Sequence, residues 1–503
     1  MSDDSRGVTI TPQDDRYAGL VEGYNHRFTG RPEVIRRART TDEAVAAVQD
    51  AVDTGRRIAV RSGGHCFEDF TASPDIQVLL DLSALCAVSY DDAMGAFVVG
   101  GGTRLDRLYQ ELHDGWGVTV PAGTCFEVGV GGHICGGGYG HLSRRDGLVV
   151  DHLYAVEVVT VDETGRARAI VATREPDDPH HDLWWAHTGG GGGSFGVVTR
   201  FWLRSPGPAP ATPEQALPRA PRRIRRADVT WSWDDLNEES FTALLRNYTD
   251  WYEKNSAPDS PGRHIWSNLI VLHRSAGAFF MNTVVDEDVP GAAELMAEHL
   301  AAITAGTGAR PVSVEEQVVS WMDTWMPSYS WPSDPRGRYK NKAGYLRRGF
   351  TDHQLAAVHR HLTDPGYDNP MACLVLTGFG GQVNAVAPDA TAVPQRDAVI
   401  KASYSAGAWT APDEDELHIA WVRRFYQDVY AETGGVPRPD DVNDGSYISY
   451  PDVDLADPAW NTSDTGWQFL YFKDNYPRLQ RVKKRYDPRD VFRHALSVEL
   501  PPS

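Results

Sequence analysis

The feature that most constrains the fold is the density of glycine in residues 121–152, PAGTCFEVGVGGHICGGGYGHLSRRDGLVVDH, where eight glycines lie between Gly123 and Gly140. Each glycine costs the interior of a helix or strand about 0.5–1 kcal/mol relative to alanine. Apolar residues such as Val128 and Tyr139 are interleaved with these glycines, which is unusual for a flexible surface loop. The pattern predicts a backbone that passes close to a ligand or to another segment.

A second glycine pair lies in RSGGHCFEDF, residues 61–70, where Gly63 and Gly64 directly precede His65. Glycine allows positive φ and a close approach to a ligand, and successive N–H groups in such a turn form a concave site for phosphate. The stretch therefore suggests a phosphate-bearing cofactor beside a histidine, with a plain surface turn as the alternative.

A third cluster, GGGGGSFGVV, contains Gly191, Gly193 and Gly196 and matches the dinucleotide-binding pattern G-x-G-x-x-G. That pattern needs a strand before it and a helix after it. The β-branched segment 196–203 that follows predicts a strand, so we do not expect a Rossmann-type nicotinamide site. The sequence also contains no phosphate-binding P-loop motif.

The five cysteines are too few and odd in number for a disulfide framework. They are Cys66, Cys86, Cys125, Cys135 and Cys373. A structural zinc site formed by Cys125, His133, Cys135 and His141 is disfavoured because no C-x-x-C pair occurs. Some other chemistry is expected to use one of these thiols.

Composition limits the partners of the chain. With 503 residues and a formal charge of −20, it is long enough to enclose a large cofactor, and most of its surface would repel nucleic acid or an anionic membrane. A neutral or cationic small molecule is the easier partner. The chain has no long apolar run and its N-terminus lacks a secretory signal pattern, so we expect a cytoplasmic protein, or a secreted one if a signal peptide is missing from this sequence. The oligomeric state is left open.

Hydrophobic periodicity predicts alternating helices and strands up to about residue 205. Helices are expected over 40–55 and 104–117, strands over 57–64, 76–83, 118–125 and 196–203, and a hairpin over 154–176. A Pro- and Arg-rich linker follows, and then helices over 238–255 and 291–306 and a strand over 371–379. Near the end of the chain, the sequence predicts a strand around 445–455 and a basic helix within 475–492 that ends at the Asp-Pro pair of residues 487 and 488.

Four stretches together carry a family resemblance: RSGGHCFEDF, PAGTC with GVGGHICGGGYG, DLWWAHTGGGGGSFGVVT, and YISYPDVDL with NYPRLQRVKKRYDPRDVF. They resemble the berberine-bridge-enzyme-type flavoprotein oxidases, and most closely the actinobacterial antibiotic-tailoring members. The likeness covers nearly the whole chain. It implies an α+β fold in which a PCMH-type FAD-binding domain of two subdomains, similar to vanillyl-alcohol oxidase, is joined to an α/β substrate domain with an antiparallel sheet covered by helices.

The resemblance also implies a division of the chain. It gives an N-terminal segment 1–31, an FAD-binding domain 32–205, a substrate-binding domain 206–440, and a C-terminal segment 441–503 that returns to the FAD domain.

Covalently attached FAD is the cofactor that the resemblance implies. The histidine of the first stretch, His65, would bond to the flavin 8α-methyl group, and the cysteine of the second, Cys125, to flavin carbon six. Two bonds would hold the flavin without protein on every face, which leaves the substrate side open for a bulky molecule. The other cofactor-binding residues implied are Arg61, Ser62, Gly63, Gly64, Cys66, Gly131, Gly132, Gly137, His141, Val150, Tyr447 and Asn475; no metal is expected.

The catalytic base implied by the resemblance is Tyr450, in SYISYPD, with Tyr139 as its partner. A tyrosine starts near pKa 10, so it needs a donor or a nearby positive charge to ionise at physiological pH. If 447–450 is a strand, Tyr447 and Ser449 lie on one face and Tyr450 on the other. Ser449 replaces the usual Asn of the family, which would weaken a contact to the flavin region.

The expected reaction is oxidation of an alcohol or sugar hydroxyl of a large natural product, with dioxygen reduced to hydrogen peroxide. Tyr345 resembles a substrate-side tyrosine of the family, and an ordinary strand tyrosine is the alternative. Oxidative ring closure by C–C bond formation and oligosaccharide oxidation remain open. A non-enzymatic carbohydrate-binding protein is the disfavoured alternative.

Overall fold

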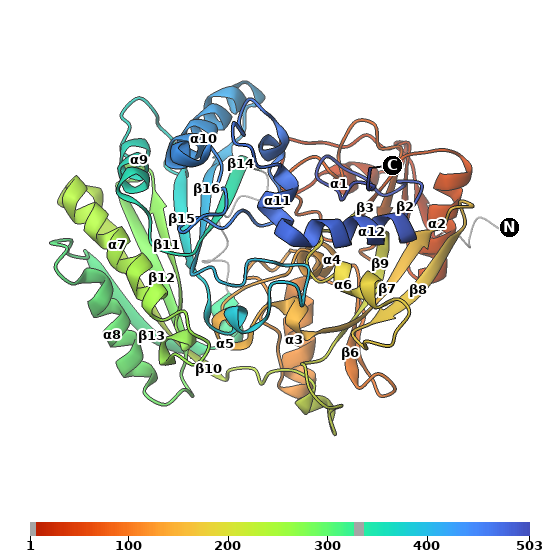
Figure 1. Cartoon of the computed structure of the whole chain (residues 1–503), viewed down its shortest axis with the longest axis horizontal. Helices are drawn as coiled ribbons and strands as arrows, with labels where there is room; N and C mark the ends of the chain where they lie inside the picture. The colour runs from red at the N-terminus through yellow and green to blue at the C-terminus, as the bar shows by residue number, and fades with distance from the viewer. Residues whose placement is uncertain (1–6, 326–336, 503) are drawn as a thin grey trace.

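The computed structural model describes residues 7–325 and 337–502 (Figure 1). Three β-sheets organise this part of the chain: two small sheets in the N-terminal half and one large sheet in the following half. One continuous hydrophobic cluster joins the halves, since it includes Val156 and Phe201 of the N-terminal half and Trp231 and Leu374 of the large sheet. Within the described residues we find no helix that combines the length and apolar character needed to span a membrane.

The first sheet has four strands in the order β1-β2-β4-β3. They are β1 (Val8–Ile10), β2 (Val34–Arg37), β3 (Ile58–Arg61) and β4 (Val78–Asp81). The β2–β4 and β3–β4 pairs are parallel, and β1 pairs antiparallel with β2. Helix α2 (Thr41–Asp53) connects β2 to β3, and its N-cap Thr40 accepts the N–H of Glu43 at 3.2 Å. The helix and the two strands predicted here are confirmed.

The second sheet is antiparallel, in the order β5-β6-β9-β7-β8. Its strands are β5 (Val88–Asp91), β6 (Ala96–Gly100), β7 (Leu153–Val161), β8 (Ala167–Thr173) and β9 (Val197–Leu203). Helix α3 (Leu105–Trp116) follows β6 and ends at Gly117, whose positive φ of 65° favours glycine. The predicted β7–β8 hairpin and the strand after the third glycine cluster are confirmed.

The third sheet has seven strands, all antiparallel, in the order β13-β10-β12-β11-β15-β16-β14. They are β10 (Arg223–Ser232), β11 (Trp266–Leu272), β12 (Ala278–Asp286), β13 (Ser313–Ser320), β14 (Arg338–Leu346), β15 (Cys373–Gly378) and β16 (Ile400–Trp409). Its outer face is covered by α7 (Glu238–Lys254), α8 (Ala292–Thr304), α9 (Asp352–Leu362) and α10 (Asp415–Val429) (Figure 1). The predicted fold class, including this helix-covered antiparallel sheet, is confirmed.

The last part of the chain crosses back to the N-terminal half (Figure 1). It contains α11 (Trp467–Phe472) and α12 (Tyr476–Tyr486), and α12 packs against α6 (His181–Ala186). The buried ammonium group of Lys483 on α12 donates to the carbonyls of Ser194 and Phe492 at 2.9 and 2.6 Å. The short helices α1 (Tyr17–Val21), α4 (Val130–Cys135) and α5 (Ser143–Asp146) complete the set of α-helices in the described residues. The predicted domain boundaries stay predictions.

Two local predictions are wrong, and one helix forms against the local preference. The segment 118–125 is not a strand, since only Val118 forms an isolated bridge, to Arg219. The strand expected around 445–455 is instead an irregular segment with a turn at 448–450. Gly131 and Gly132 lie within the short helix α4, although glycine disfavours helices. In each case contacts with distant segments outweigh the local preference.

Candidate active site

A cavity of about 470 Å³ lies between the glycine-rich loops of the N-terminal half and the inner face of the third sheet. Its walls come from β3 and the loop that follows, the loops around residues 125 and 192, helix α4, residues 447–451, and strands β11, β12, β14, β15 and β16. Twelve predicted site residues line it: Arg61, Ser62, Gly63, Gly64, His65, Cys66, Cys125, Gly131, Gly132, Tyr139, Tyr447 and Tyr450.

Two of the glycine-rich loops pack directly on each other. A Cβ atom on Gly63 would lie 2.2 Å from the backbone nitrogen of Gly129, and one on Gly129 would lie 2.1 Å from that of Gly63. The Ser62 hydroxyl links the loops, because it donates to the carbonyl of Gly101 at 2.7 Å and accepts the N–H of Gly131 at 3.3 Å. Loop-to-loop packing therefore requires glycine at positions 63 and 129.

Other glycines face open space in the cavity. A Cβ atom on Gly132 would meet no atom within 4 Å, and one on Gly192 would meet only Gly132 and Cys135, at 3.8 and 4.0 Å. Gly191 and Gly193 have positive φ values of 87° and 77°, which side chains rarely adopt. Side chains here would fill the space in which a flat, phosphate-bearing cofactor has to lie. The residues present fit FAD.

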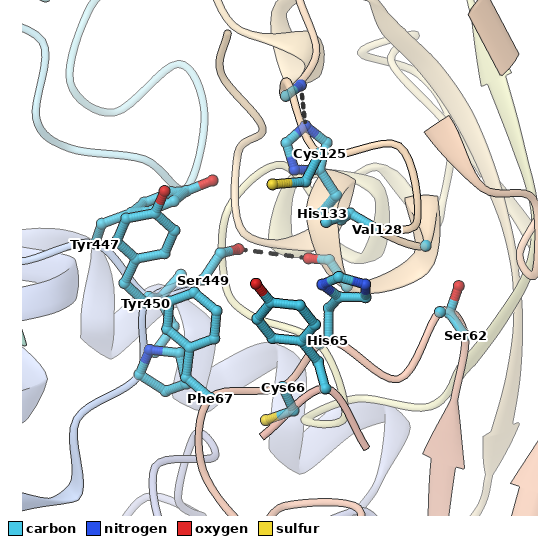
Figure 2. A pocket seen from close by; sticks show the side chains of 18 of the residues that line it. Ser62, His65, Cys66, Phe67, Cys125, Val128, His133, Tyr447, Ser449 and Tyr450 are labelled. Carbon is cyan, nitrogen blue, oxygen red and sulfur yellow. Dashed lines mark hydrogen bonds between the residues drawn. The ribbon is translucent and has the colours of Figure 1, made fainter. Parts of the chain in front are cut away.

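His65 and Cys125 approach the cavity from separate loops (Figure 2). Burial, together with Arg104 and Arg61, lowers the pKa of His65 to about 4, so its imidazole is neutral at physiological pH. Burial, together with Glu127, raises the pKa of Cys125 to about 11, so its thiol is protonated. A neutral imidazole keeps a lone pair on one ring nitrogen, as bond formation requires.

His133 on α4 holds the loop that carries Cys125. Its Nε2 atom accepts the N–H of Gly123 at 3.1 Å (Figure 2), and burial lowers the pKa of His133 to about 4, which keeps that nitrogen an acceptor. The sequence analysis considered this histidine only as a zinc ligand. The described residues contain no cluster of three or more His, Cys, Asp or Glu side chains suited to a metal ion.

Tyr447 and Tyr450 lie across the cavity from His65 (Figure 2), and Tyr139 joins them. The Tyr139 and Tyr450 hydroxyls are 2.8 Å apart, and the Tyr447 hydroxyl accepts the N–H of Gly138 at 3.2 Å. The sequence analysis placed Tyr447 and Tyr450 on opposite faces of a strand, which is wrong. The turn, closed by a 2.9 Å hydrogen bond from the Tyr450 N–H to the Tyr447 carbonyl, brings their ring centroids within 5.3 Å.

Ser449 lies in the same turn and packs against α4. Its hydroxyl donates to the Gly132 carbonyl at 3.5 Å, a long and therefore weak contact (Figure 2). A Cβ atom on Gly136 would lie only 1.8 Å from the Ser449 oxygen. The small side chains at these two positions therefore allow the turn to approach α4 closely.

The sequence analysis missed Lys401 on β16. Its ammonium nitrogen is 3.6 Å from the ring centroids of Tyr139 and Tyr450 and 4.0 Å from that of Tyr447. Within residues 7–325 and 337–502 it has no hydrogen-bond partner. Burial lowers the pKa of Lys401 well below its usual value, whereas three ring faces stabilise its cationic form. The only sequence signal is a lysine in an otherwise buried strand pattern.

Buried ion pairs anchor the two segments that carry His65 and Tyr450. Lys340 on β14 donates to Glu68 and to Asp452, both at 2.8 Å. Lys342, on the same face of β14, donates to Asp454 at 3.0 Å. All five side chains are nearly inaccessible to solvent. Through Lys340 and Lys342, strand β14 thus connects the loop after β3 to the C-terminal segment.

Five predicted site residues are not among the described residues that line the cavity: Gly137, His141, Val150, Tyr345 and Asn475. The side-chain amide of Asn475 donates to the carbonyls of Pro388 and Thr391, at 2.8 and 3.2 Å. Tyr345 is 2% exposed and packs edge-on behind Tyr447, with 6.3 Å between centroids. Tyr345 therefore supports the cavity wall through Tyr447, whereas Asn475 holds the segment around residues 388–391.

The remaining three also lie behind the wall. The Val150 N–H donates to the Gly137 carbonyl at 3.2 Å, which fixes the turn before Tyr139. The buried His141 ring packs edge-on against Trp266, with 4.2 Å between centroids, and Trp266 itself lines the cavity. These three residues support residues that line the cavity, Tyr139 and Trp266, but do not line it themselves.

Where the inner face of the third sheet lines the cavity, the charged side chains among the described lining residues are Lys401 and Arg338. The other lining side chains of this sheet are a mixture of polar, aromatic and aliphatic groups: Trp266, Asn268, Ile270, Phe280, Asn282, Tyr339, Asn341, Val375, Thr377, Ser403, Ser405 and Ala408. No aspartate or glutamate occurs among the described lining residues. This wall favours a neutral molecule that has both hydroxyl groups and apolar surface.

Comparisons with known proteins agree with this geometry. The family model described as "FAD binding domain" matches residues 32–168, and the one described as "Berberine and berberine like" matches residues 446–499. Aclacinomycin-N/aclacinomycin-A oxidase of Streptomyces galilaeus is 48% identical over 98% of this chain and 90% of its own length. The chain belongs to the berberine bridge enzyme-like family. As a member of that family it is an FAD-linked oxidoreductase.

Two solved structures resemble this berberine bridge enzyme-like chain closely. CrmK, a flavoenzyme of caerulomycin biosynthesis, is 48% identical, with a TM-score of 0.95 over 98% of this chain and 99% of its own. Glycopeptide hexose oxidase DBV29, solved with teicoplanin, is 48% identical, with a TM-score of 0.93 over 98% of each chain. The family likeness and the predicted FAD-binding fold are confirmed.

Proposed function

We propose that the protein is a bicovalent FAD-dependent oxidase that removes a hydride from an alcohol or sugar hydroxyl of a large natural product. FAD would be attached through His65 and Cys125. Bound there, it would accept the hydride and pass the electrons to dioxygen, giving hydrogen peroxide. The cavity supports this proposal because it combines a neutral imidazole, a thiol and a tyrosine cluster around one space.

The observation that carries the proposal is the 2.8 Å contact between the Tyr139 and Tyr450 hydroxyls, beside the ammonium group of Lys401. Hydride departure from an alcohol carbon requires that the hydroxyl proton leaves with it or before it. Tyr450 is the proposed acceptor of that proton in its phenolate form, and before the substrate binds the Tyr139 hydroxyl would donate a hydrogen bond to that phenolate. The hydrogen bond lowers the pKa of Tyr450 against the larger, opposite effect of burial.

Lys401 is proposed to stabilise the Tyr450 phenolate, because the hydrogen bond from Tyr139 does not offset the effect of burial. Burial raises the pKa of Tyr450 and lowers that of Lys401, so each charged form alone is unfavourable. A phenolate and an ammonium in contact stabilise each other, and the two groups therefore titrate as a pair. This pairing makes a buried phenolate accessible near neutral pH, where a general base has to act.

The substrate is proposed to be neutral. The amides and hydroxyls of Asn268, Asn341 and Thr377 suit the hydroxyl groups of a sugar or polyol, and Trp266 and Phe280 suit an apolar ring. The sequence analysis allowed a cationic substrate, but the described lining offers a cation no carboxylate. One relative is named as an aclacinomycin oxidase, and another, named as a glycopeptide hexose oxidase, was solved with teicoplanin. These two relatives support a glycosylated natural product.

The test has two parts. The purified protein should be yellow, and the flavin should stay with the chain after acid precipitation and denaturing electrophoresis. Incubation with glycosylated natural products should yield hydrogen peroxide and a product that has lost two hydrogens, with a carbonyl signal in NMR that separates alcohol oxidation from ring closure. Release of all flavin on denaturation would refute the covalent attachment, and the absence of peroxide with a reduced flavin would refute the oxidase.

A further inference from the structure

The ring of His65 is oriented by stacking. Within residues 7–325 and 337–502, neither of its ring nitrogens makes a hydrogen bond, whereas the Tyr24 ring stacks on it with 4.3 Å between centroids and 18° between planes. Histidines that use one ring nitrogen for chemistry are commonly oriented by a hydrogen bond at the other. Here that orienting contact is replaced by an aromatic face.

Tyr24 itself is held on both sides. Its backbone N–H donates to the carbonyl of Gly64 at 2.8 Å, directly before the histidine. Its ring also meets Tyr339 of β14 edge-on, with 5.5 Å between centroids. Both Tyr24 and Tyr339 line the cavity. The stacked face is therefore fixed to the loop that follows β3 and to the third sheet.

Asn25, the next residue in the chain, also contacts the loop after β3 and the third sheet. The buried side-chain amide of Asn25 donates to the carbonyl of Phe67 at 2.8 Å and to that of Tyr339 at 3.1 Å. The guanidinium group of Arg61 also donates to the Leu20 carbonyl. Helix α1 and the segment between it and β2 thus contact strand β3 and the loop around His65 at several points.

We infer that Tyr24 is a positioning residue for the covalent attachment at His65. Its ring holds the imidazole plane so that a ring nitrogen faces the cavity, where the flavin methyl group would lie. Attachment replaces a C–H bond of that methyl group and the imidazole N–H with one C–N bond. Two electrons and two protons leave, and dioxygen, the oxidant of the proposed reaction, takes them up as hydrogen peroxide. The inference rests on the bicovalent attachment proposed above.

The experiment measures how much of the chain carries flavin at each site. Tyr24→Leu removes the aromatic face, and Tyr24→Phe, the matched control, keeps it without the hydroxyl. Purified full-length protein is acid-precipitated and digested, and mass spectrometry gives the flavin-bearing fraction of the His65 peptide and of the Cys125 peptide. We expect Tyr24→Leu to lower the fraction at His65 at least about fivefold with the Cys125 fraction near that of the unsubstituted protein, and Tyr24→Phe to change neither.

Three results would overturn the inference: full attachment at His65 in Tyr24→Leu, an equal loss at both peptides, or the same loss at His65 in Tyr24→Phe. An unsubstituted protein without flavin on His65 would overturn the proposed attachment itself, and the inference with it. If Tyr24→Leu does not fold, Asn25→Ser removes both amide contacts but keeps the ring. It should then slow attachment at His65 relative to Cys125, and equal slowing at both sites would overturn the inference.

Discussion

Replacing Lys401 with methionine tests the electrostatic role of the buried amine. Methionine has a similar length and removes the amino group, whose nitrogen lies 3.6 Å from the ring centroids of Tyr139 and Tyr450. Two unit charges about 4 Å apart interact by about 4 kcal/mol at an effective dielectric constant of about 20. Because a pKa difference of one corresponds to about 1.4 kcal/mol, loss of this attraction raises the pKa of the Tyr450 phenol by up to about 3.

The assay is anaerobic stopped-flow measurement of flavin reduction between about pH 6 and pH 10, a range that reaches the ordinary pKa of tyrosine. In Lys401→Met the rising limb of the pH profile should move to higher pH. At a fixed pH below that limb, the rate should fall about tenfold for every increase of one in the pKa of Tyr450, since the phenolate fraction falls by that factor. Ser403→Ala, on the same face of β16 and lining the same cavity, is the matched control and should leave the profile unchanged.

Stability provides an independent readout of the same substitution. The buried Lys401 nitrogen lacks a hydrogen-bond partner among the described residues, and burying such a group costs folding free energy. Lys401→Met should therefore raise the thermal unfolding midpoint while it slows flavin reduction. An unchanged pH profile and rate, with the flavin still attached, would refute the proposed role of the lysine.

Three further predictions concern the tyrosine pair, the two attachment residues and a buried carboxylate. Tyr450→Phe should keep the flavin attached but slow flavin reduction about 100-fold or more, the usual scale for loss of a general base. If Tyr450→Phe reduces its flavin at the original rate, the base is another residue. Tyr139→Phe should slow flavin reduction less and raise the pKa seen in the pH profile of the rate. His65→Ala and Cys125→Ala should each leave a singly attached flavin with an altered absorption spectrum, and only the double variant should release flavin on denaturation; release from either single variant would contradict two attachment points. Burial alone would raise the pKa of Asp454, but neighbouring cations outweigh it and hold this pKa below its ordinary value, so Asp454→Asn should lower the free energy of unfolding by about 3–5 kcal/mol near neutral pH. A carboxylate whose pKa is lower in the folded than in the unfolded chain stabilises the fold at pH values above its pKa in the unfolded chain, about 4, and this stabilisation is lost as the pH falls toward the pKa in the folded protein. The difference in free energy of unfolding between the two proteins, measured in urea, should therefore shrink below about pH 4. A difference that does not depend on pH would contradict the ion pairing.

Local sequence patterns predicted the elements whose stabilisation is local. Helix α2 has an N-cap threonine and an apolar stripe, and α3 ends at Gly117, because capping and periodicity act within a few residues. The motifs also identified His65, Cys125, Tyr139 and Tyr450, which the structure brings to one cavity. The motifs predicted these residues together because residues that bind one ligand can be far apart in the chain.

Tertiary contacts decided the rest. The turn at residues 447–450 has the composition of a strand, but its packing against α4 brings Tyr447 and Tyr450 to the same side. Lys401 reads as an ordinary residue of a buried strand, and Tyr24 lies in a segment with no motif. Their roles depend on rings contributed by residues that are far away in sequence, and the orientation of a side chain toward such partners is set only when the loops and sheets pack.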